Sequence, residues 1–239
     1  MKYLDLTLPT AELNLACDEA LIDWCEADGD LEVLRIWEPR QAFVVLGYAN
    51  HAAVEADLEE CRTRGIPVLR RCTGGGTVLQ GEGCVNFTLV LRMDSVDALR
   101  TIPGTNRYVL NRNRGVLSDL LGEPVRVRGG VDLTVGAFKS SGNAQRRKRT
   151  HLLFHGTLLV GLDLDLLDAV LRFPSKQPEY RAGRSHREFV RNLPLDGAAL
   201  RRGLRLAWKA EETLTKVPMD LVERLAREKY SRREWNLKY

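Results

Sequence analysis

The segment RRCTGGGTVLQGEGCVNFTL, residues 70–89, joins two predicted strands through three consecutive glycines. Glycine has no Cβ atom, so such a loop leaves its backbone open to a ligand, and its free φ lets several N–H groups converge on an anion. The adjacent Arg70 and Arg71 add charge-assisted donors that suit a carboxylate or a phosphate. A plain hairpin turn between solvated arginines explains three glycines equally well. The segment is not a P-loop, because that motif ends in G-K-[ST] and enters a helix.

Upstream of this segment the sequence predicts helices and strands that do not alternate strictly. Apolar residues recur every three or four positions over residues 10–25, with Thr10 as the N-cap, and predict an amphipathic helix. Two apolar β-rich runs, residues 31–37 and 42–47, are predicted to pair as neighbouring strands. A further helix is predicted to end just before Gly65.

Downstream, strands again precede helices, and Lys139 is expected at the end of a strand, before a Ser-Ser-Gly turn. The other elements expected here are strands at 84–93, 125–127, 131–135 and 151–162, helices at 103–122, 164–172 and 198–215, a polar loop at 173–189 and a helix after Pro218. This order indicates an α+β fold with mixed, largely antiparallel sheets packed with helices.

Composition excludes several classes of protein. The 36 Lys and Arg against 32 Asp and Glu give a net charge of +4, which is too small to indicate a nucleic-acid partner. Five cysteines without a C-x-x-C pair argue against a disulfide framework and a zinc site, and favour the reducing cytoplasm. No run of eighteen apolar residues and no signal peptide is present, so we expect no membrane association.

A second segment, FKSSGNAQRRKRTHLLFHGTLL, residues 138–159, carries further candidate residues. Lys139 could meet a triphosphate or a mixed anhydride as a point charge, although a lone lysine is usually a solvated surface residue. His151 and His155 share one face of a predicted strand. Because no third ligand stands at metal spacing, structural histidines are favoured over a metal site.

Together, RRCTGGGTVLQ, FKSSGNAQRRKR and LFHGTLL resemble the lipoate-protein ligase A family, within the biotin/lipoate ligase fold. The resemblance extends to NLACDEAL and RIWEPRQAFVVLG upstream and to KQPEYRAGRSHREFVRNL downstream, in the family's order. It implies a catalytic domain over residues 1–195 and a C-terminal helical appendage over residues 196–239 that is similar to a trimmed accessory region. It also implies a monomer.

The resemblance implies an ATP-dependent lipoate-protein ligase, in which lipoate and ATP, with Mg²⁺, give lipoyl-AMP and the lipoyl group then passes to a lysine of a carrier protein. The implied carriers are a lipoyl domain, the glycine-cleavage H protein or an H-like lipoate-binding protein. Lys139 becomes the catalytic residue, in contact with the acyl carbonyl and the α-phosphate, and Asp132 lies near the nucleotide and its Mg²⁺. The residues implied to bind the nucleotide and the acyl group are Arg71, Gly74, Gly75, Gly76, Thr77, Val78, Leu79, Gly156 and Thr157, with Cys84 and His155 as further candidates for the pocket.

The sequence departs from the family pattern at a few positions, so other functions of the same fold are considered beside the ligase. Gln80-Gly81 stands where the family commonly has His-Asp, and Gly83-Cys84 stands where it has Gly-Asn. The main alternative is a cysteine-dependent octanoyltransferase or lipoyl amidotransferase of the same fold. Those enzymes place their cysteine just before or after the lysine, and this chain has none beyond Cys84. A non-catalytic partner subunit is disfavoured by the retained Lys139 and triple glycine, and a biotin ligase by the missing G-R-G-R-x-G-R loop.

Overall fold

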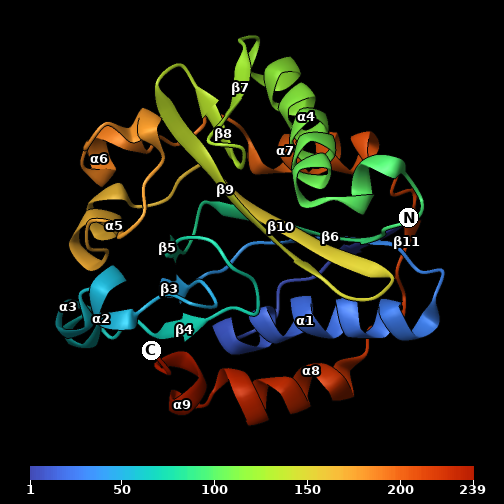
Figure 1. Ribbon diagram of the computed structural model, residues 1–239, viewed down its shortest axis with the longest axis horizontal. Coiled ribbons are helices and arrows are strands. Elements are labelled where there is room, and N and C mark those ends of the chain that lie inside the picture. Colours follow the sequence, from blue (N-terminus) through green and yellow to red (C-terminus); the bar gives the residue numbers. More distant parts are fainter.

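The computed structural model describes the whole chain, residues 1–239, as a large and a small sheet surrounded by helices (Figure 1). The large sheet has the order β11-β1-β2-β6-β10-β9-β8-β7, and the small sheet has the order β4-β3-β5. β11, β1 and β2 pair in parallel and the other neighbours in the large sheet are antiparallel, which confirms the expected α+β class. The strands are β1 (Lys2–Asp5), β2 (Val33–Trp37), β3 (Phe43–Leu46), β4 (Val68–Arg70), β5 (Val78–Gln80), β6 (Cys84–Arg92), β7 (Val125–Arg128), β8 (Asp132–Val135), β9 (Phe138–Arg147), β10 (His151–Leu159) and β11 (Glu212–Thr213).

The two longest helices have capping residues at both ends, and α1 runs three residues beyond the expected end at residue 25. α1 begins after Thr10, whose side chain accepts a hydrogen bond from the Leu13 amide, and it ends at Gly29, which has a φ of 90°. α4 begins after Thr101 in the same way and ends at the left-handed Gly122. The helices are α1 (Ala11–Asp28), α2 (Ala52–Glu55), α3 (Leu58–Thr63), α4 (Ile102–Leu121), α5 (Leu164–Val170), α6 (His186–Phe189), α7 (Gly197–Ala207), α8 (Met219–Leu225) and α9 (Arg233–Asn236).

The large sheet separates two helical layers. α4 and α7 cover one face, and α1, with α8 beneath it, covers the other (Figure 1). β6 shows the alternation that this requires, because successive side chains of a strand point to opposite faces. Phe87 and Leu89 pack in the core under α4 and α7, whereas Val90 packs with α1. The face toward α1 is therefore the one on which polar residues of β6 and β10 become available for a site.

Four features differ from the sequence-based expectations, and one is that α6 forms within the expected loop 173–189. β2 and β3 do not pair: β2 lies between β1 and β6 in the large sheet, and β3 is the centre of the small one. Lys139 is the second residue of β9, and the Ser-Ser-Gly sequence continues this strand instead of turning. α7 ends at Ala207, and the chain then adds β11 to the large sheet beside β1, so the expected helix to residue 215 is too long.

Residues 196–239 pack closely against the preceding residues. α7 lies against α4, with Leu200, Leu204 and Trp208 in the same core as β6. α8 and the π-helical turn Ala226–Tyr230 lie along α1. Residues 196–239 thus complete the hydrophobic cores of the fold. The boundary at residue 195 between a catalytic domain and an appendage stays a prediction. None of the helices has both the length and the apolar character needed to cross a membrane.

Candidate functional site

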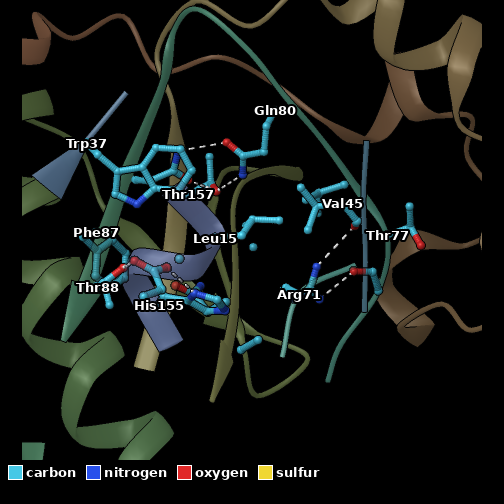
Figure 2. Close-up of a pocket in the computed structure, with 18 residues that line it drawn as sticks. Leu15, Trp37, Val45, Arg71, Thr77, Gln80, Phe87, Thr88, His155 and Thr157 are labelled. Atoms are coloured by element: carbon cyan, nitrogen blue, oxygen red, sulfur yellow. Dashed lines mark hydrogen bonds and ion pairs between the residues drawn. The ribbon is translucent and has the colours of Figure 1, made fainter. Parts of the chain in front are cut away.

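A cavity of about 100 Å³ lies on the α1 side of the large sheet, where α1 and the small sheet meet it (Figure 2). α1 contributes Leu15 and Asp18, and the small sheet contributes Val45, Val78 and Gln80. The remaining lining residues come from β2, β6, β9 and β10 and from the glycine-rich loop. The cavity is therefore built by segments far apart in the sequence.

One row of residues across the sheet carries charge, and we call it the charged row. Arg35 of β2 lies opposite Thr88 of β6, which lies opposite His155 of β10, and Asp18 of α1 joins them. Asp18 accepts hydrogen bonds from Arg35 Nη1 at 2.7 Å, from Thr88 Oγ1 at 2.9 Å and from His155 Nδ1 at 3.0 Å. Burial alone would raise the pKa of Asp18, but the hydrogen bond from His155 and the Arg35 charge outweigh it and hold the pKa below the ordinary value.

The next row, nearer the start of β6, is uncharged, and we call it the neutral row. Trp37, Asn86 and Thr157 lie opposite one another on β2, β6 and β10, and Gln80 of β5 joins them. Three hydrogen bonds form a closed ring: Gln80 Nε2 donates to Thr157 Oγ1 at 2.6 Å, Thr157 Oγ1 to Asn86 Oδ1 at 2.5 Å, and Asn86 Nδ2 to Gln80 Oε1 at 2.9 Å (Figure 2). Gln80, at the position where the family commonly has histidine, thus belongs to a ring without a titratable group.

The triple-glycine loop is held by Arg71. Its guanidinium donates to the carbonyls of Gly74 at 2.6 Å and Gly76 at 2.8 Å, and to Thr73 Oγ1 at 2.9 Å. Burial lowers the pKa of Arg71 to about 10, so it stays charged at neutral pH. Thr73 Oγ1 also lies 2.8 Å from His155 Nε2, and this contact connects the loop to the charged row.

A bulge brings Lys139 to the edge of the cavity. The pairing of β8 with β9 passes from Leu133 opposite Ser141 to Thr134 opposite Lys139, so Ser140 is an extra residue. A Cβ atom at Gly142, which lines the cavity, would lie 3.9 Å from Lys139 Nζ. The ammonium group is therefore beside the cavity.

Lys139 is also oriented by a carboxylate. Lys139 Nζ lies 2.8 Å from Asp132 Oδ1, and the Tyr180 hydroxyl donates to Asp132 Oδ2 at 2.7 Å. Burial and the Asp132 charge raise the pKa of Tyr180, which stays protonated and able to donate this bond. Lys139 thus presents a fixed positive charge at the edge of a mostly buried site.

The structure brings together part of the residue set expected from the sequence. The expected residues that line the cavity are Arg71, Gly76, Thr77, Val78, His155, Gly156 and Thr157. Gly74 is exposed and Gly75 has a φ of 90° in the same loop, and neither lines the cavity. The roles of all these residues in binding stay predictions.

Two expected residues lie behind the cavity. Leu79 points away from it into the core of the small sheet, because β5 alternates and its neighbours Val78 and Gln80 take the inner face. Cys84 shares a face of β6 with Asn86, but it lies one row further along, opposite Leu159, where Val44 and Leu79 cover it. It is fully buried, and burial raises the pKa of its thiol to about 12.

Sequence reasoning missed several residues of the site. Asp18 lies in NLACDEAL and Trp37 in RIW. Both strings served to predict a helix, a strand and the family, and no role in the site was predicted for either residue. Asp18 lies one turn from both Leu15 and Ile22 on a predicted helix, and an acidic residue between such apolar neighbours is the signal that could have found it. Asn86 likewise interrupts an apolar strand.

The residues present do not form a site for a resident metal ion. No group of three His, Cys, Asp or Glu side chains converges anywhere in the chain. Asp132, the expected Mg²⁺ contact, is buried and has its two oxygens engaged by Lys139 and Tyr180.

Comparison with known proteins adds relatives of two kinds. The sequence model of the lipoyl protein ligase A/B catalytic domain matches residues 10–196. Lipoate-protein ligase A subunit 1 of Thermoplasma acidophilum is 32% identical over 94% of this chain and 91% of its own. The octanoyltransferase LipM of Brevibacillus brevis is 26% identical over 99% of this chain and 98% of its own.

Three solved structures superpose with a TM-score of 0.81. One is a bi-partite lipoate protein ligase studied with its E2 lipoyl domain from T. acidophilum, 30% identical over 99% of this chain and 95% of that one. A lipoate protein ligase of the same organism with bound lipoic acid is 28% identical over 100% and 99%. A lipoate-protein ligase A bound with ATP is 29% identical over 99% and 98%. Because ligases and an octanoyltransferase both appear, similarity alone does not separate the two activities.

Proposed function

The chain belongs to the lipoyl protein ligase A/B catalytic domain family, and from that premise we propose that it is an ATP-dependent lipoate-protein ligase. In the first step the lipoate carboxylate attacks the α-phosphorus of ATP, which forms the lipoyl-AMP anhydride and breaks the bond to pyrophosphate. In the second, the ε-amine of a carrier lysine attacks the acyl carbon, an amide forms, AMP leaves with the bonding electrons, and the amine loses a proton.

The burial of all five cysteines is the observation that favours a ligase over a transferase. A transferase of this fold needs a thiolate that reaches the acyl group, whereas all five cysteines here are buried and none lines the cavity. Burial raises the pKa of Cys17 and Cys72 to about 11 and that of Cys25 and Cys84 to about 12, which disfavours thiolates at neutral pH. Activation by ATP needs no such nucleophile.

The chain's own residues supply binding and charge. We assign the apolar wall of Leu15, Val45 and Val78 to the acyl chain, and the triple-glycine loop to the anionic end of the activated ligand. Lys139, beside Gly142, is placed to stabilise the negative charge that develops on the acyl oxygen and the α-phosphate. Asp132 holds that ammonium in place from the side away from the cavity.

The carrier is a protein that presents an exposed lysine, and a lipoyl domain is the first candidate, because the bi-partite relative was studied with its E2 lipoyl domain. The glycine-cleavage H protein and H-like lipoate-binding proteins are the other candidates. We further propose that the reaction takes place in the cytoplasm, where five unpaired thiols stay reduced.

Pyrophosphate release tests the proposal. The wild-type protein, mixed with lipoate, ATP and Mg²⁺, should release pyrophosphate and add the mass of a lipoyl group to a lipoyl domain. Lys139→Ala should lower both by at least about a hundredfold, since it removes the charge that stabilises the transition state. Lys148→Ala is the matched control: Lys148 is exposed to a similar degree and pairs with Asp23, but it lies outside the cavity.

Two results would contradict the ligase. One is wild-type protein that transfers an octanoyl group between carriers without ATP and forms a thioester that maps to one of the cysteines. The other is a Lys139→Ala variant as active as Lys148→Ala, which would remove Lys139 from the mechanism.

A further inference from the structure

Arg70, the neighbour of the loop-holding Arg71, is a fully buried cation without a carboxylate partner. Its Nη1 donates to the carbonyls of Gly47 at 2.8 Å, Tyr48 at 3.1 Å and Asn50 at 2.8 Å. These carbonyls replace water at Nη1, whereas the buried Nη2 has no hydrogen-bond partner. The segment 47–50 is thus gathered around this single side chain.

The segment 47–50 is the support of the triple-glycine loop. A Cβ atom at Gly47 would lie 2.0 Å from the carbonyl oxygen of Gly75, so the two backbones touch. The Tyr48 amide donates to the Thr73 carbonyl at 2.8 Å. Asn50 Oδ1 accepts the Gly47 amide at 2.7 Å and the Thr77 hydroxyl at 3.2 Å. Displacement of 47–50 would therefore displace residues that line the cavity.

Arg70 is held in turn from the far end of the sequence. Trp235 Nε1 donates to the Arg70 carbonyl at 2.9 Å, and the Arg70 amide donates to Asn236 Oδ1 at 3.0 Å. Arg70 Nε donates to the Trp235 carbonyl at 3.2 Å. Both backbone groups of Arg70, and one nitrogen of its side chain, are thus engaged by α9.

The α9 region has its own anchor on α1. Lys229 Nζ donates to Glu19 at 2.9 and 2.7 Å, and the Tyr230 hydroxyl donates to Glu19 Oε2 at 2.7 Å. Asn236 Nδ2 donates to the Tyr230 carbonyl at 2.8 Å, which joins α9 to this anchor. Residues 229–236 therefore connect a buried carboxylate on α1 with the strand that leads into the glycine loop.

We propose that residues 229–236 act as a clamp that positions the triple-glycine loop for its ligand through Arg70, with Trp235 and Asn236 as positioning residues. The hydrogen bonds of the clamp go to Arg70 and Glu19 and not to a cavity-lining residue, so its effect is on the conformation of the loop. The identity of the ligand used below rests on the proposed function, whereas the conformational part does not.

The experiment compares two double variants of the full-length protein. Trp235→Phe with Asn236→Ala removes the two hydrogen bonds to the backbone of Arg70, together with the one from Asn236 to the Tyr230 carbonyl. Trp208→Phe with Asn113→Ala removes the same two kinds of group elsewhere, since Trp208 Nε1 donates to Asn113 Oδ1 at 2.8 Å between α7 and α4. Each pair loses an indole N–H and a primary amide, so the two variants are chemically matched.

Hydrogen exchange without ligand is the first measurement. The clamp variant should exchange the amides of residues 47–50 and 73–77 about tenfold faster than wild type, and the control variant should leave them unchanged. Lipoate titration is the second measurement. The dissociation constant should rise about tenfold in the clamp variant only, while kcat at saturating lipoate stays within about twofold. Arg70→Lys, which keeps the charge but loses the fork, should fall between wild type and the clamp variant.

Unchanged exchange at 47–50 and 73–77 in the clamp variant would overturn the inference, as would equal effects from both double variants. If the clamp variant shows the exchange effect but the wild-type protein releases no pyrophosphate, the ligase is contradicted and the clamp stands. If the wild-type protein is an active ligase and the clamp variant behaves like it in exchange and binding, the clamp is contradicted and the ligase stands.

Discussion

The charged row and the neutral row lie two residues apart on the same three strands, yet they hold the cavity wall by different chemistry. In the charged row a carboxylate, a guanidinium and an imidazole are bound together under α1. In the neutral row an amide, a second amide and a hydroxyl close a ring. Because only the first contains titratable groups, the two rows should respond differently to substitution and to pH.

The largest effect is expected at Asp18. Asp18→Asn removes the carboxylate that offsets the fully buried Arg35, and an uncompensated buried charge costs about 3–5 kcal/mol. Urea denaturation at pH 7 should show this loss in the free energy of unfolding. Asp23→Asn, on the same helix but in a partly exposed pair with Lys148, should cost less than about 1 kcal/mol. Equal losses would show that the charged row has no special role.

The charged row should also make stability depend on pH. The pKa of Asp18 lies below its ordinary value of 3.8 in the folded protein, so its contribution to stability is present above pH 4 and is lost as the pH falls through the folded pKa. The stability gap between wild type and Asp18→Asn should therefore shrink in urea denaturation below pH 4. A gap that stays constant down to pH 3 would contradict a lowered pKa.

The neutral row should show a smaller effect that is independent of pH. Thr157→Val keeps the shape of the side chain but leaves Gln80 Nε2 and Asn86 Oδ1 without partners, at a cost of about 1–3 kcal/mol. Its stability gap should be equal at pH 7 and pH 3.5. Lipoate titration should show weaker binding by less than about tenfold. A pH-dependent gap would mean that the two rows are coupled.

The smallest effect is expected one row further along β6, at Cys84. Its thiol is covered by the small sheet, so Cys84→Ser should lower the free energy of unfolding by only about 1 kcal/mol. ATP-dependent pyrophosphate release should stay within about twofold of wild type. Loss of activity in a folded Cys84→Ser protein would favour the transferase.

The sequence predicted those elements that are set by local signals. The helices expected at residues 10–25 and 103–122 have clear apolar spacing, and both form within three residues of those bounds. The partner of a strand is not a local property, which is why β2 and β3 were expected to pair and do not. Their short connection allowed a hairpin, but the buried side chains of β2 are accommodated between β1 and β6.

The candidate site divides in the same way. The glycine, arginine and lysine residues of segments 70–89 and 138–159 could be recognised as candidate ligand contacts from the sequence, because each occurs within one short segment. The charged and neutral rows depend on cross-strand register between β2, β6 and β10, and one sequence contains no direct record of which residues face one another. Asp18 and Asn86 were not predicted as site residues, because each stands within a segment that was interpreted only as a helix or strand.

The bulge at Ser140 makes the number of residues in this part of β9 matter as much as their kinds. Gly142 lines the cavity, and in a regular strand Lys139, three residues before it, would lie on the opposite face. The extra residue reverses that parity and turns the lysine toward Gly142. Loss of one residue between Lys139 and Gly142 would remove the bulge and leave the lysine two residues from Gly142, on the same face of a regular strand. A strand of the present length thus needs the bulge to bring the lysine to the cavity, whereas a strand shorter by one residue would not.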